Sequence, residues 1–497
     1  MPEATKIQKF GKIRSILWPI HNFELKKILP MNLLLFCILF VFTATRNLKD
    51  IFIQKYAIFG GTELISSLKT LFVLPITFVI TMLLSAFINK SGMKRIFYVV
   101  CSFYGVFFLI FAFFIFPNVN SIQVSEDAVL KLFQSFPSQL RYIILCIINW
   151  PYTIFYIFAE TWGSIALNYL FWSLANQITK KNEVTRFYAL YLFFGNNGGL
   201  LAGACLYLMS NTSNRVVFDN NLKLLCIISS VFCFLIMGIY YYISKVVMKD
   251  EKLYDTSQIE SKKEKLKIGF FEGIKILFTN PYVFLIFMLP VCCGIGINLY
   301  EGIFKAYLAT TFDVIKMSKL QGMLLIFTTI FTVILNIAAV HILRKYSWKT
   351  NALIMPTILT ITVTAFYLLI FYVKTSQSNI SYILGLSIPI LTVWVGIIVD
   401  IFSKGATYCL FDPTKSMVYI PLDKQIKEQS QAAVELIGGK GGKAGGGLIT
   451  MLILAFSSGS TLLDHIPMFL VLFLMVMLAW IFSVIKLSKE YERKKTQ

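Results

Sequence analysis

The fold of this chain is decided by residues 400–449, which read DIFSKGATYCLFDPTKSMVYIPLDKQIKEQSQAAVELIGGKGGKAGGGLI. One apolar segment ends in this stretch, a polar loop follows, and the next apolar segment begins with seven glycines from Gly438 to Gly447. That segment carries Lys440 and Lys443 into the bilayer, where an ammonium group is costly unless it lines a wet cavity or meets an anion. The glycines permit close helix approach or a broken helix at the same level. We therefore interpret the other apolar segments as transmembrane segments that surround intramembrane charges of this kind.

The composition is that of a polytopic membrane protein. Of the 497 residues, 57% are hydrophobic and only 14% are charged, and the mean hydropathy is +0.72. The net charge of +21 would suit nucleic-acid binding only if the basic residues shared one soluble face, whereas here they lie in short loops between apolar runs. A soluble enzyme is therefore excluded. We expect the lipid bilayer, and no nucleic acid, as a partner.

No motif for catalysis or for a metal site survives inspection. The nine cysteines lie almost entirely in apolar segments without metal-ligand spacing, and the three histidines are scattered. The glycine-rich GGKGGKAGG lacks the spacing of an ATPase phosphate loop and does not follow a strand. We therefore expect no enzymatic activity, no cofactor and no bound metal.

Twelve apolar runs are long enough, at about 20 residues each, to cross a bilayer as helices. They begin near Met31, Leu64, Ile96, Tyr142, Phe187, Leu222, Val283, Leu320, Ala352, Tyr382, Ala432 and Pro467. The longest polar stretch, residues 245–280, divides them six and six. The predicted organisation is a cytoplasmic N-terminal segment (1–30), a first six-helix half (31–247), a cytoplasmic linker (248–280), a second six-helix half (281–487) and a cytoplasmic tail (488–497).

Charge and spacing indicate how the two halves are arranged. Lysine and arginine are concentrated in alternate loops, and the positive-inside rule then places both termini in the cytoplasm. A faint internal repeat is present, because Glu160 and Lys404 lie 244 residues apart, as do Gly198 and Gly442. Parallel repeats of six helices around a substrate site near the membrane midplane are the major-facilitator plan. The predicted fold is therefore an all-α, major-facilitator-like protein with twelve transmembrane helices.

The ionisable residues inside the apolar runs comprise seven cations and four carboxylates. Since each excess positive charge is costly until an anion pairs with it, this imbalance suits a polyanionic substrate. Two alternatives stay open: the charges form structural ion pairs between helices, or Lys69 and Arg46 extend to the outer interface. The full set is Arg46, Lys49, Asp50, Lys69, Glu160, Glu301, Lys305, Asp400, Lys404, Lys440 and Lys443.

Aromatic and amide side chains of the fourth predicted span are further candidates for contact with a ligand. Stacking on a base is one interpretation of the aromatic residues, and lipid or interfacial packing is the other. Helix capping and recognition of a base edge are the two interpretations of the amides. The residues are Tyr156, Trp162, Phe171 and Trp172, together with Asn176 and Gln177.

Several blocks resemble the nucleotide transporters, or ATP/ADP translocases, of obligate intracellular bacteria and plastids. The matching blocks, which cover nearly the full length, are KKILPMNLLLFCILFVFTATRNLKD, SLKTLFVLP, FAETWGSIALNYLFWSLANQITK, INLYEGIFKAYL, and IFSKGATYCLFDPTKSMVYIPLDK with AAVELIGGKGGKAGGGLI. The resemblance implies that the charged residues essential for transport are Lys69, Glu160, Glu301 and Lys443. The other intramembrane charges and the two amides are secondary candidates.

The resemblance implies an antiporter that takes up host ATP and returns ADP across the bacterial inner membrane by alternating access. Lys69 and Lys443 would pair with phosphates, while Glu160 and Glu301 would hold the cations in register. The cation surplus disfavours a proton-coupled major-facilitator exporter, and no paired nucleophile and base supports a lipid-modifying enzyme. The nearest alternative is a carrier of other nucleotides, such as GTP/GDP, CTP or UTP. We expect a monomer.

Overall fold

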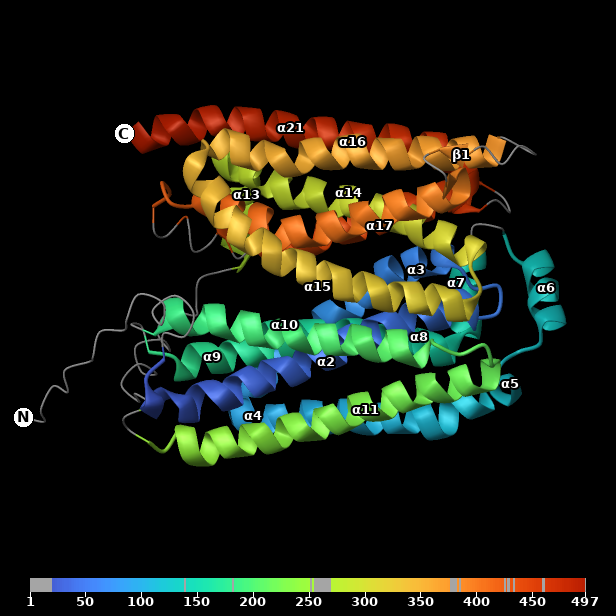
Figure 1. Cartoon of the computed structure of the whole chain (residues 1–497), viewed down its shortest axis with the longest axis horizontal. Coiled ribbons are helices and arrows are strands. Elements are labelled where there is room, and N and C mark those ends of the chain that lie inside the picture. Colours follow the sequence, from blue (N-terminus) through green and yellow to red (C-terminus); the bar gives the residue numbers. More distant parts are fainter. Residues whose placement is uncertain are drawn as a thin grey trace, which may run out of the picture.

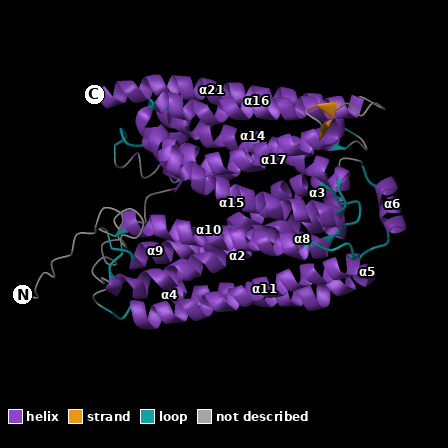
Figure 2. Ribbon diagram, viewed as in Figure 1, coloured by secondary structure: helices purple, strands orange, loops and turns teal. Residues whose placement is uncertain are grey.

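The computed structural model is almost entirely helical (Figure 2) and describes residues 20–137, 140–180, 183–250, 253, 270–375, 382–383, 386–423, 426, 430–431, 434–457 and 461–496. Figure 1 shows two groups of long helices lying side by side, and the beginning of α2 (Leu25–Lys55) lies at the same end of the molecule as the end of α21 (Ile466–Thr496). We call this end the terminal end and the opposite one the far end. The predicted all-α fold is confirmed.

The first group holds the elements up to residue 250, where η marks a 3-10 or π-helical segment. They are η1 (Asn22–Glu24), α2, α3 (Thr62–Ser67), η2 (Leu68–Val73), α4 (Leu74–Ile110), η3 (Phe111–Ile115), η4 (Phe116–Asn118), α5 (Val119–Ile122), α6 (Glu126–Ser135), α7 (Arg141–Ile148), α8 (Trp150–Trp162), η6 (Gly163–Phe171), α9 (Trp172–Ile178), α10 (Val184–Met209), α11 (Arg215–Tyr242) and η7 (Ile243–Val247).

The second group holds the elements from residue 270 onward. They are α13 (Phe270–Thr279), α14 (Pro281–Thr311), α15 (Val314–Lys345), α16 (Trp348–Thr375), the two-residue strands β1 (Tyr382–Ile383) and β2 (Leu386–Ser387), α17 (Ile388–Ala406), η8 (Thr407–Phe411), α18 (Asp412–Met417), η9 (Val434–Lys440), α20 (Gly441–Phe456), η10 (Leu462–His465) and α21.

Most of these segments are long and apolar enough to cross a membrane. Within the described residues there are ten such spans, and a pair of helices bent by 90°, Arg141–Ile148 and Trp150–Ile178, supplies an eleventh if it counts as one span. The remaining predicted span coincides with η9 and α20, where seven π-helical residues are followed directly by sixteen α-helical ones. Its predicted start, Ala432, lies outside the described residues.

Two predicted spans open with another element before their main helix, and a proline lies in the first turn of each main helix. The run from Tyr142 forms only the short α7 before the chain bends, and α8 then begins with Pro151 in its first turn. The run from Tyr382 opens with the antiparallel pair of β1 and β2, and α17 then begins with Pro389 in its first turn. Proline lacks a backbone N–H and is accommodated in the first turn of a helix, where that donor has no partner.

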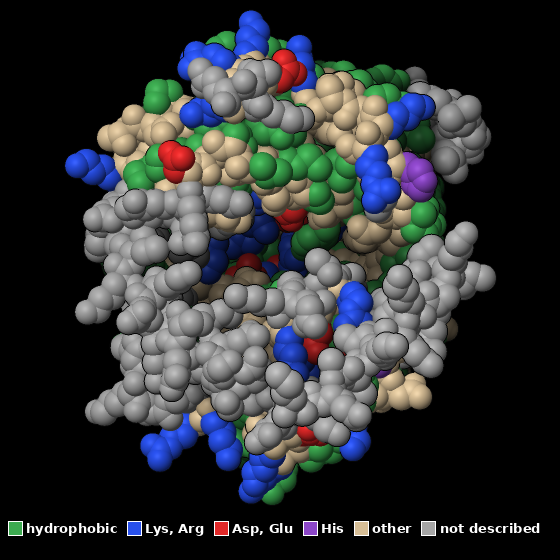
Figure 3. Space-filling view, turned by 90° about the vertical axis from the view of Figure 1, so that its left-hand side faces the viewer, with side chains coloured by type: hydrophobic (Ala, Val, Ile, Leu, Met, Phe, Trp, Pro, Cys, Tyr) green, Lys and Arg blue, Asp and Glu red, His purple; other side chains and the backbone are tan. Residues whose placement is uncertain are grey.

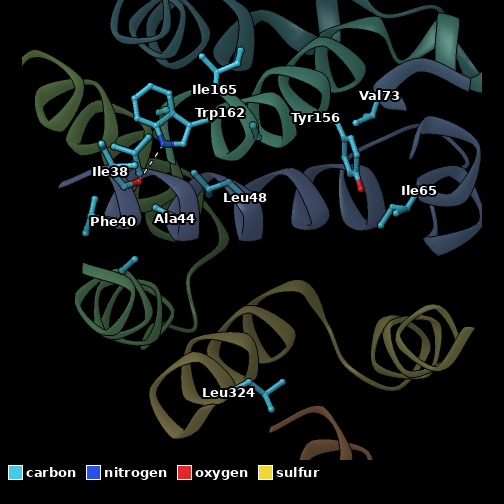
Figure 4. Packing of buried hydrophobic residues seen from close by; sticks show 14 of the residues in the cluster. Ile38, Phe40, Ala44, Leu48, Ile65, Val73, Tyr156, Trp162, Ile165 and Leu324 are labelled. Carbon is cyan, nitrogen blue, oxygen red and sulfur yellow. Dashed lines mark hydrogen bonds between the residues drawn. The ribbon is translucent and has the colours of Figure 1, made fainter. Parts of the chain in front are cut away.

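Two long helices, α2 and α14, form the cores of the two groups. α2 packs against α8, α10 and α11, and α14 packs against α20 and α21. The indole Nε1 of Trp162 donates to the backbone oxygen of Ile38 at 3.1 Å, so that α8 is held on α2 (Figure 4). A buried tryptophan with its N–H satisfied combines a large apolar contact with a directional bond.

Glycines allow the closest helix contacts in both groups. A Cβ atom at Gly198 of α10 would lie 2.1 Å from the backbone oxygen of Phe36 on α2. A Cβ atom at Gly442 of α20 would lie 2.8 Å from the backbone oxygen of Val291 on α14. These contacts admit only glycine, so two glycines 244 residues apart seat the fifth and eleventh spans on the first long helix of each group.

π-helical turns recur beside the intramembrane charges. η6 begins three residues after Glu160 and η8 begins three residues after Lys404, so the two starts are also 244 residues apart. η2 contains Lys69 and η9 ends at Lys440. Because π-helical turns are rare and are found frequently at functional sites, these four places become candidates for ligand contact.

We expect Gly442→Ala to lower the free energy of unfolding by about 1–3 kcal/mol, because the added methyl group meets backbone atoms of α14 that cannot turn away. The matched control is Gly439→Ala, where a Cβ atom meets nothing within 4 Å. The measurement is the thermal unfolding of both variants in the same detergent. Equal melting temperatures for the two variants would contradict the tight α14–α20 contact.

Candidate functional site

Seven charged side chains form one continuous series of ion pairs across the boundary between the two groups of helices. The sign of the charge alternates from each member to the next. In order of contact they are Glu160, Lys49, Asp50, Lys305, Glu301, Lys404 and Asp400.

Lys49 of α2 anchors the series in the first group. Its Nζ lies 3.1 Å from Glu160 Oε2 of α8 and 3.0 Å from Asp50 Oδ1. The same ammonium lies 3.8 Å from the centroid of the Tyr156 ring. The Lys49 side chain is only 2% exposed, and a cation buried to this extent requires such partners to offset its lost hydration. Glu160, whose partner the sequence left open, is thus paired with Lys49.

Asp50 is shared between the two groups. Its Oδ1 faces Lys49 on the same helix, and its Oδ2 accepts a hydrogen bond from Lys305 Nζ of α14 at 3.0 Å. Among the ion pairs of the described residues, Asp50–Lys305 is the one that joins the first group to the second. Lys305 also lies 3.9 Å from Glu301, one turn earlier on α14.

Lys404 of α17 completes the series within the second group. Its Nζ lies 2.7 Å from Asp400 Oδ2 and 3.8 Å from Glu301 Oε1. The spacing of four residues places Asp400 and Lys404 on one helix face, and the structure pairs them there. Glu301 therefore links α14 to α17, as Glu160 links α8 to α2.

Four further intramembrane cations have no ion-pair partner among the described carboxylates: Arg46, Lys69, Lys440 and Lys443. The ammonium of Lys69 in η2 is repelled by that of Lys305 and attracted by Glu301. The guanidinium of Arg46 is attracted by Glu301 and Glu160. Lys440 Nζ lies 3.4 Å from Ser164 Oγ, across the boundary between the groups. Lys443, one turn further along the same helix, is exposed.

The region as a whole is positively charged. The series of seven contains one more carboxylate than lysine, and the four unpaired cations outweigh that single negative charge. In the part of the chain that the structure describes, no group of three or more His, Cys, Asp or Glu side chains is arranged to hold a metal ion. The excess of cations is therefore suited to a polyanion.

A hollow between the two groups opens at the terminal end. Figure 3 looks onto this end and shows basic and acidic side chains in the depth of the hollow, below a rim of other residues. Charged groups that would be excluded from lipid are thus accessible from one side of the molecule. A substrate entering from the terminal end would meet them directly.

At the far end the two groups are held together by polar contacts. The ammonium of Lys55, at the end of α2, donates to backbone oxygens at the C-terminal end of α14, with 2.8 Å to that of Phe312. The backbone nitrogen of Leu462 donates to Glu63 Oε1 of α3 at 3.1 Å. A cation at a helix C-terminus satisfies carbonyl groups that have no partner within the helix. The two groups of helices are therefore in contact at this end.

The aromatic candidates of the fourth span separate clearly by burial. Tyr156, Trp162 and Phe171 have no exposed surface, so they cannot stack on a base in this conformation. They serve instead as packing, with Tyr156 beneath Lys49 and Trp162 bonded to α2. Trp172 is the partly exposed member of the four.

The two amide candidates lie on α9 near the terminal end, away from the ion-pair series. Asn176 is exposed, and its Oδ1 accepts a hydrogen bond from the hydroxyl group of Tyr188 on α10. Gln177 is partly exposed beside it. The structure therefore separates the predicted residues into a charged cluster and a distant polar pair.

Three residues of the site were missed by sequence reasoning. Ser164, which Lys440 contacts, lies four residues after Glu160, and that spacing was a usable signal. Tyr188 lies at the start of an apolar run and carried no signal of its own. Lys55 binds backbone oxygens of the second group of helices, and no pattern of side chains in the sequence predicts such a contact.

We expect Asp50→Asn to lower the free energy of unfolding by about 3–5 kcal/mol, because Lys49 and Lys305 would then lose the carboxylate that they share. Replacing Lys305 by Gln in the same protein should restore part of the loss. The matched control is Asp313→Asn, whose exposed pair with Lys316 contributes little. The effect is measured by thermal unfolding, in detergent, of the wild type, Asp50→Asn, the double variant with Lys305→Gln, and Asp313→Asn. An Asp50→Asn protein as stable as Asp313→Asn would refute the prediction.

Comparison with known proteins places these observations in a family. Residues 3–491 match the family model described as TLC ATP/ADP transporter. The chain is 34% identical over 485 residues to ADP,ATP carrier protein 1 of Rickettsia prowazekii (strain Madrid E), covering 97% of this chain and 96% of the relative. It is 32% identical over 492 residues to ADP,ATP carrier protein 1 of Chlamydia muridarum (strain MoPn / Nigg), covering 98% and 92%.

Solved structures show the fold alone. The bacterial homologue of the iron transporter ferroportin, in an inward-facing state, superposes with a TM-score of 0.58 at 12% identity, covering 94% of this chain and 100% of that one. The D-xylose-proton symporter superposes with a TM-score of 0.55 at 13% identity, covering 93% and 97%. The predicted major-facilitator-like architecture is confirmed by these likenesses.

Proposed function

Since the chain belongs to the TLC ATP/ADP transporter family, we propose that the hollow between its two groups of helices is the site at which it exchanges ATP for ADP. The protein is a multi-pass membrane transporter and not an enzyme, and ATP and ADP are its transported substrates. The observation that supports this site is the set of four cations without a carboxylate partner among the described residues. In a low-dielectric interior, such a surplus is costly until an anion neutralises it.

Lys69 and Lys443 are the primary phosphate ligands in this proposal. They lie on different groups of helices, so a polyphosphate that contacts both would bridge the two groups. Lys440 is one turn from Lys443 on the η9–α20 helix, and Arg46 approaches from α2. A chain of two or three phosphates has enough oxygen atoms to meet several of these cations at once.

Glu160 and Glu301 have a different role in this proposal, because each is already paired with a lysine. Glu160 fixes Lys49, and Glu301 lies between Lys305 and Lys404. These carboxylates hold the neighbouring cations in position and balance their charge while no nucleotide is bound. The pairing also disfavours a proton-coupled exporter, since a proton relay needs a carboxylate that can give up its cation.

We propose alternating access as the mechanism, with residues 31–247 and 281–487 as the moving halves. Both termini are cytoplasmic and the membrane is the bacterial inner membrane in this proposal, so the hollow of Figure 3 faces the cytoplasm. Opening of the far end would require Lys55 to leave α14 and Asp50 to part from Lys305. Of the proposed linker, 248–280, residues 251–252 and 254–269 lie outside the described residues.

The same charges explain why exchange is favoured over one-way transport. An empty cavity with surplus cations is costly to carry through an occluded state, and a bound polyanion removes that cost. ATP and ADP each satisfy the requirement, so each return movement needs a nucleotide. We propose that the protein acts as a monomer and that other nucleotides compete through their phosphates for the same cations.

We expect Lys443→Ala to abolish ATP/ADP exchange while the protein still reaches the membrane, because a phosphate loses its cation. Lys443→Arg should keep part of the activity, since charge is retained with altered geometry. The measurement is uptake of labelled ATP into liposomes loaded with ADP. Lys316→Ala, at an exposed surface lysine, serves as the control. Full activity in Lys443→Ala would remove this residue from the site.

We also expect the exchange to move net charge. ATP carries about one more negative charge than ADP, and an elementary charge crossing 100 mV changes the free energy by about 2.3 kcal/mol. Entry of ATP against exit of ADP should therefore respond to an imposed potassium diffusion potential, because the fixed protein charges are the same in both directions. Rates that do not change with the sign of the potential would show that another ion compensates the difference.

A further inference from the structure

A stripe of accessible residues follows the fourth span from the ion-pair series toward the terminal end. Its members are four residues apart, and all are partly or fully exposed: Glu160, Ser164, Asn168, Trp172 and Asn176. On the opposite side of the same helix, Ala166, Leu170 and Leu174 are buried. The fourth span therefore turns one continuous face away from the packed interior of the first group.

The π-helical segment explains how this face stays straight. In an α-helix, four residues overshoot one turn by roughly 40°, so a stripe with this spacing would drift around the axis. A π-helix holds more residues in each turn, and η6 covers the middle of the stripe, from Gly163 to Phe171. The drift in α8 and α9 is thus counteracted, and the five side chains share one face.

This face borders the hollow between the groups and not the lipid. Ser164 is contacted by Lys440 of the second group, which places this part of the stripe at the boundary. Asparagine and glutamate side chains on a lipid-facing surface would also be strongly unfavourable. A contrasting stripe on α17 contains only apolar residues, Ile390, Trp394 and Ile398, which are 49%, 44% and 60% exposed. That second stripe has the character of a lipid-facing surface.

The stripe ends in an aromatic pair with an amide beside it. The Trp172 ring lies 5.2 Å from the ring of Tyr188 on α10, with an interplanar angle of 58°. The Tyr188 hydroxyl donates to Asn176 Oδ1, which fixes the orientation of the amide. The pair is partly exposed, so it offers an aromatic surface edged by polar atoms. Such surfaces bind nucleic-acid bases by stacking and by contacts to their edges.

We propose that Trp172, Tyr188 and Asn176 form the subsite for the base of the transported nucleotide, with Asn168 beside the ribose. This inference rests on the proposed function, because it requires phosphates held near the ion-pair series. The twelve residues from Glu160 to Trp172 span at most about 18 Å at 1.5 Å per residue. An extended nucleoside triphosphate can bridge such a distance, with its phosphates at the cations and its base at the aromatic pair.

Tyr408 is the rival for the stacking role. It follows Lys404 by four residues on η8 and is 65% exposed. It interacts electrostatically with Arg46, however, and therefore lies at the level of the unpaired cations. At that level its hydroxyl group is placed to donate to a phosphate, whereas Trp172 lies further toward the terminal end.

The test compares two inhibitors of labelled ATP uptake into liposomes that contain the full chain and internal ADP. Unlabelled ATP has phosphates and a base, whereas inorganic tripolyphosphate has phosphates alone. Trp172→Ala should raise the half-inhibitory concentration of ATP roughly tenfold and leave that of tripolyphosphate unchanged. Trp172→Phe should retain most of the ATP affinity, and Tyr188→Phe should alter the preference for ATP over GTP. Trp394→Ala on the apolar stripe of α17 is the matched control.

Each outcome decides between the subsite and its rivals. An equal change for both inhibitors in Trp172→Ala, or no change for either, overturns the subsite in favour of a structural role. A selective loss of ATP affinity in Tyr408→Ala, with Trp172→Ala unaffected, assigns the base to the second group and also overturns it. If Trp172→Ala does not fold, Asn176→Ala takes its place: a weaker inhibition by ATP with unchanged inhibition by tripolyphosphate supports the subsite, and an equal change or no change for both inhibitors overturns it. A wild-type protein that does not exchange ATP overturns the proposed function itself. If the wild type is active, and Trp172→Ala has the same ratio of half-inhibitory concentrations for ATP and tripolyphosphate as the wild type, the subsite alone is overturned.

Discussion

Asp50 accepts hydrogen bonds from a lysine on its own helix and from a lysine of the opposite group, and the organisation of the charged site depends on this sharing. A carboxylate so deeply buried is tolerable only because two cations replace its water. Those cations are in turn satisfied by Glu160 and Glu301, which extends the pairing into both groups. Removing one member therefore leaves its neighbours with an unpaired charge, so the ion pairs of the series depend on one another.

The backbone is adapted to hold these charges at the boundary. Glycines let α10 and α20 approach the core helices α2 and α14 so closely that no Cβ atom would fit. π-helical turns follow Glu160 and Lys404 at the same distance in the two groups. Both devices keep polar residues on inward faces of spans that are otherwise apolar. The paired charges and the free cations are consequently brought to one place by the same repeat.

The repeat is symmetric in backbone but not in chemistry, as an asymmetric ligand requires. In the first group the stripe below the ion-pair series contains a serine, asparagines and a tryptophan. The corresponding residues of the second group, 244 positions later, are Tyr408, Asp412, Ser416 and Ile420. A nucleotide has a charged end and an aromatic end, so a two-fold arrangement of identical side chains would suit neither.

Much of this architecture could be predicted from the sequence, because the relevant constraints are local. Hydropathy determines which segments span the bilayer. The surplus of intramembrane cations and the offset of 244 residues are also properties of the chain alone. Family membership follows from blocks that extend over nearly its full length.

Only the tertiary structure decided which charges pair and which remain available. The carboxylate of Asp50 could have met any of several lysines, and its contact with Lys305, 255 positions away, depends on how the two groups pack. The same packing buries Tyr156 and Trp162 and leaves Trp172 accessible, although all three lie on one span. Spacing along a helix gives the direction of a side chain relative to its own axis. What that side chain meets is set by neighbouring helices, whose approach depends on long-range contacts such as Gly442 on Val291.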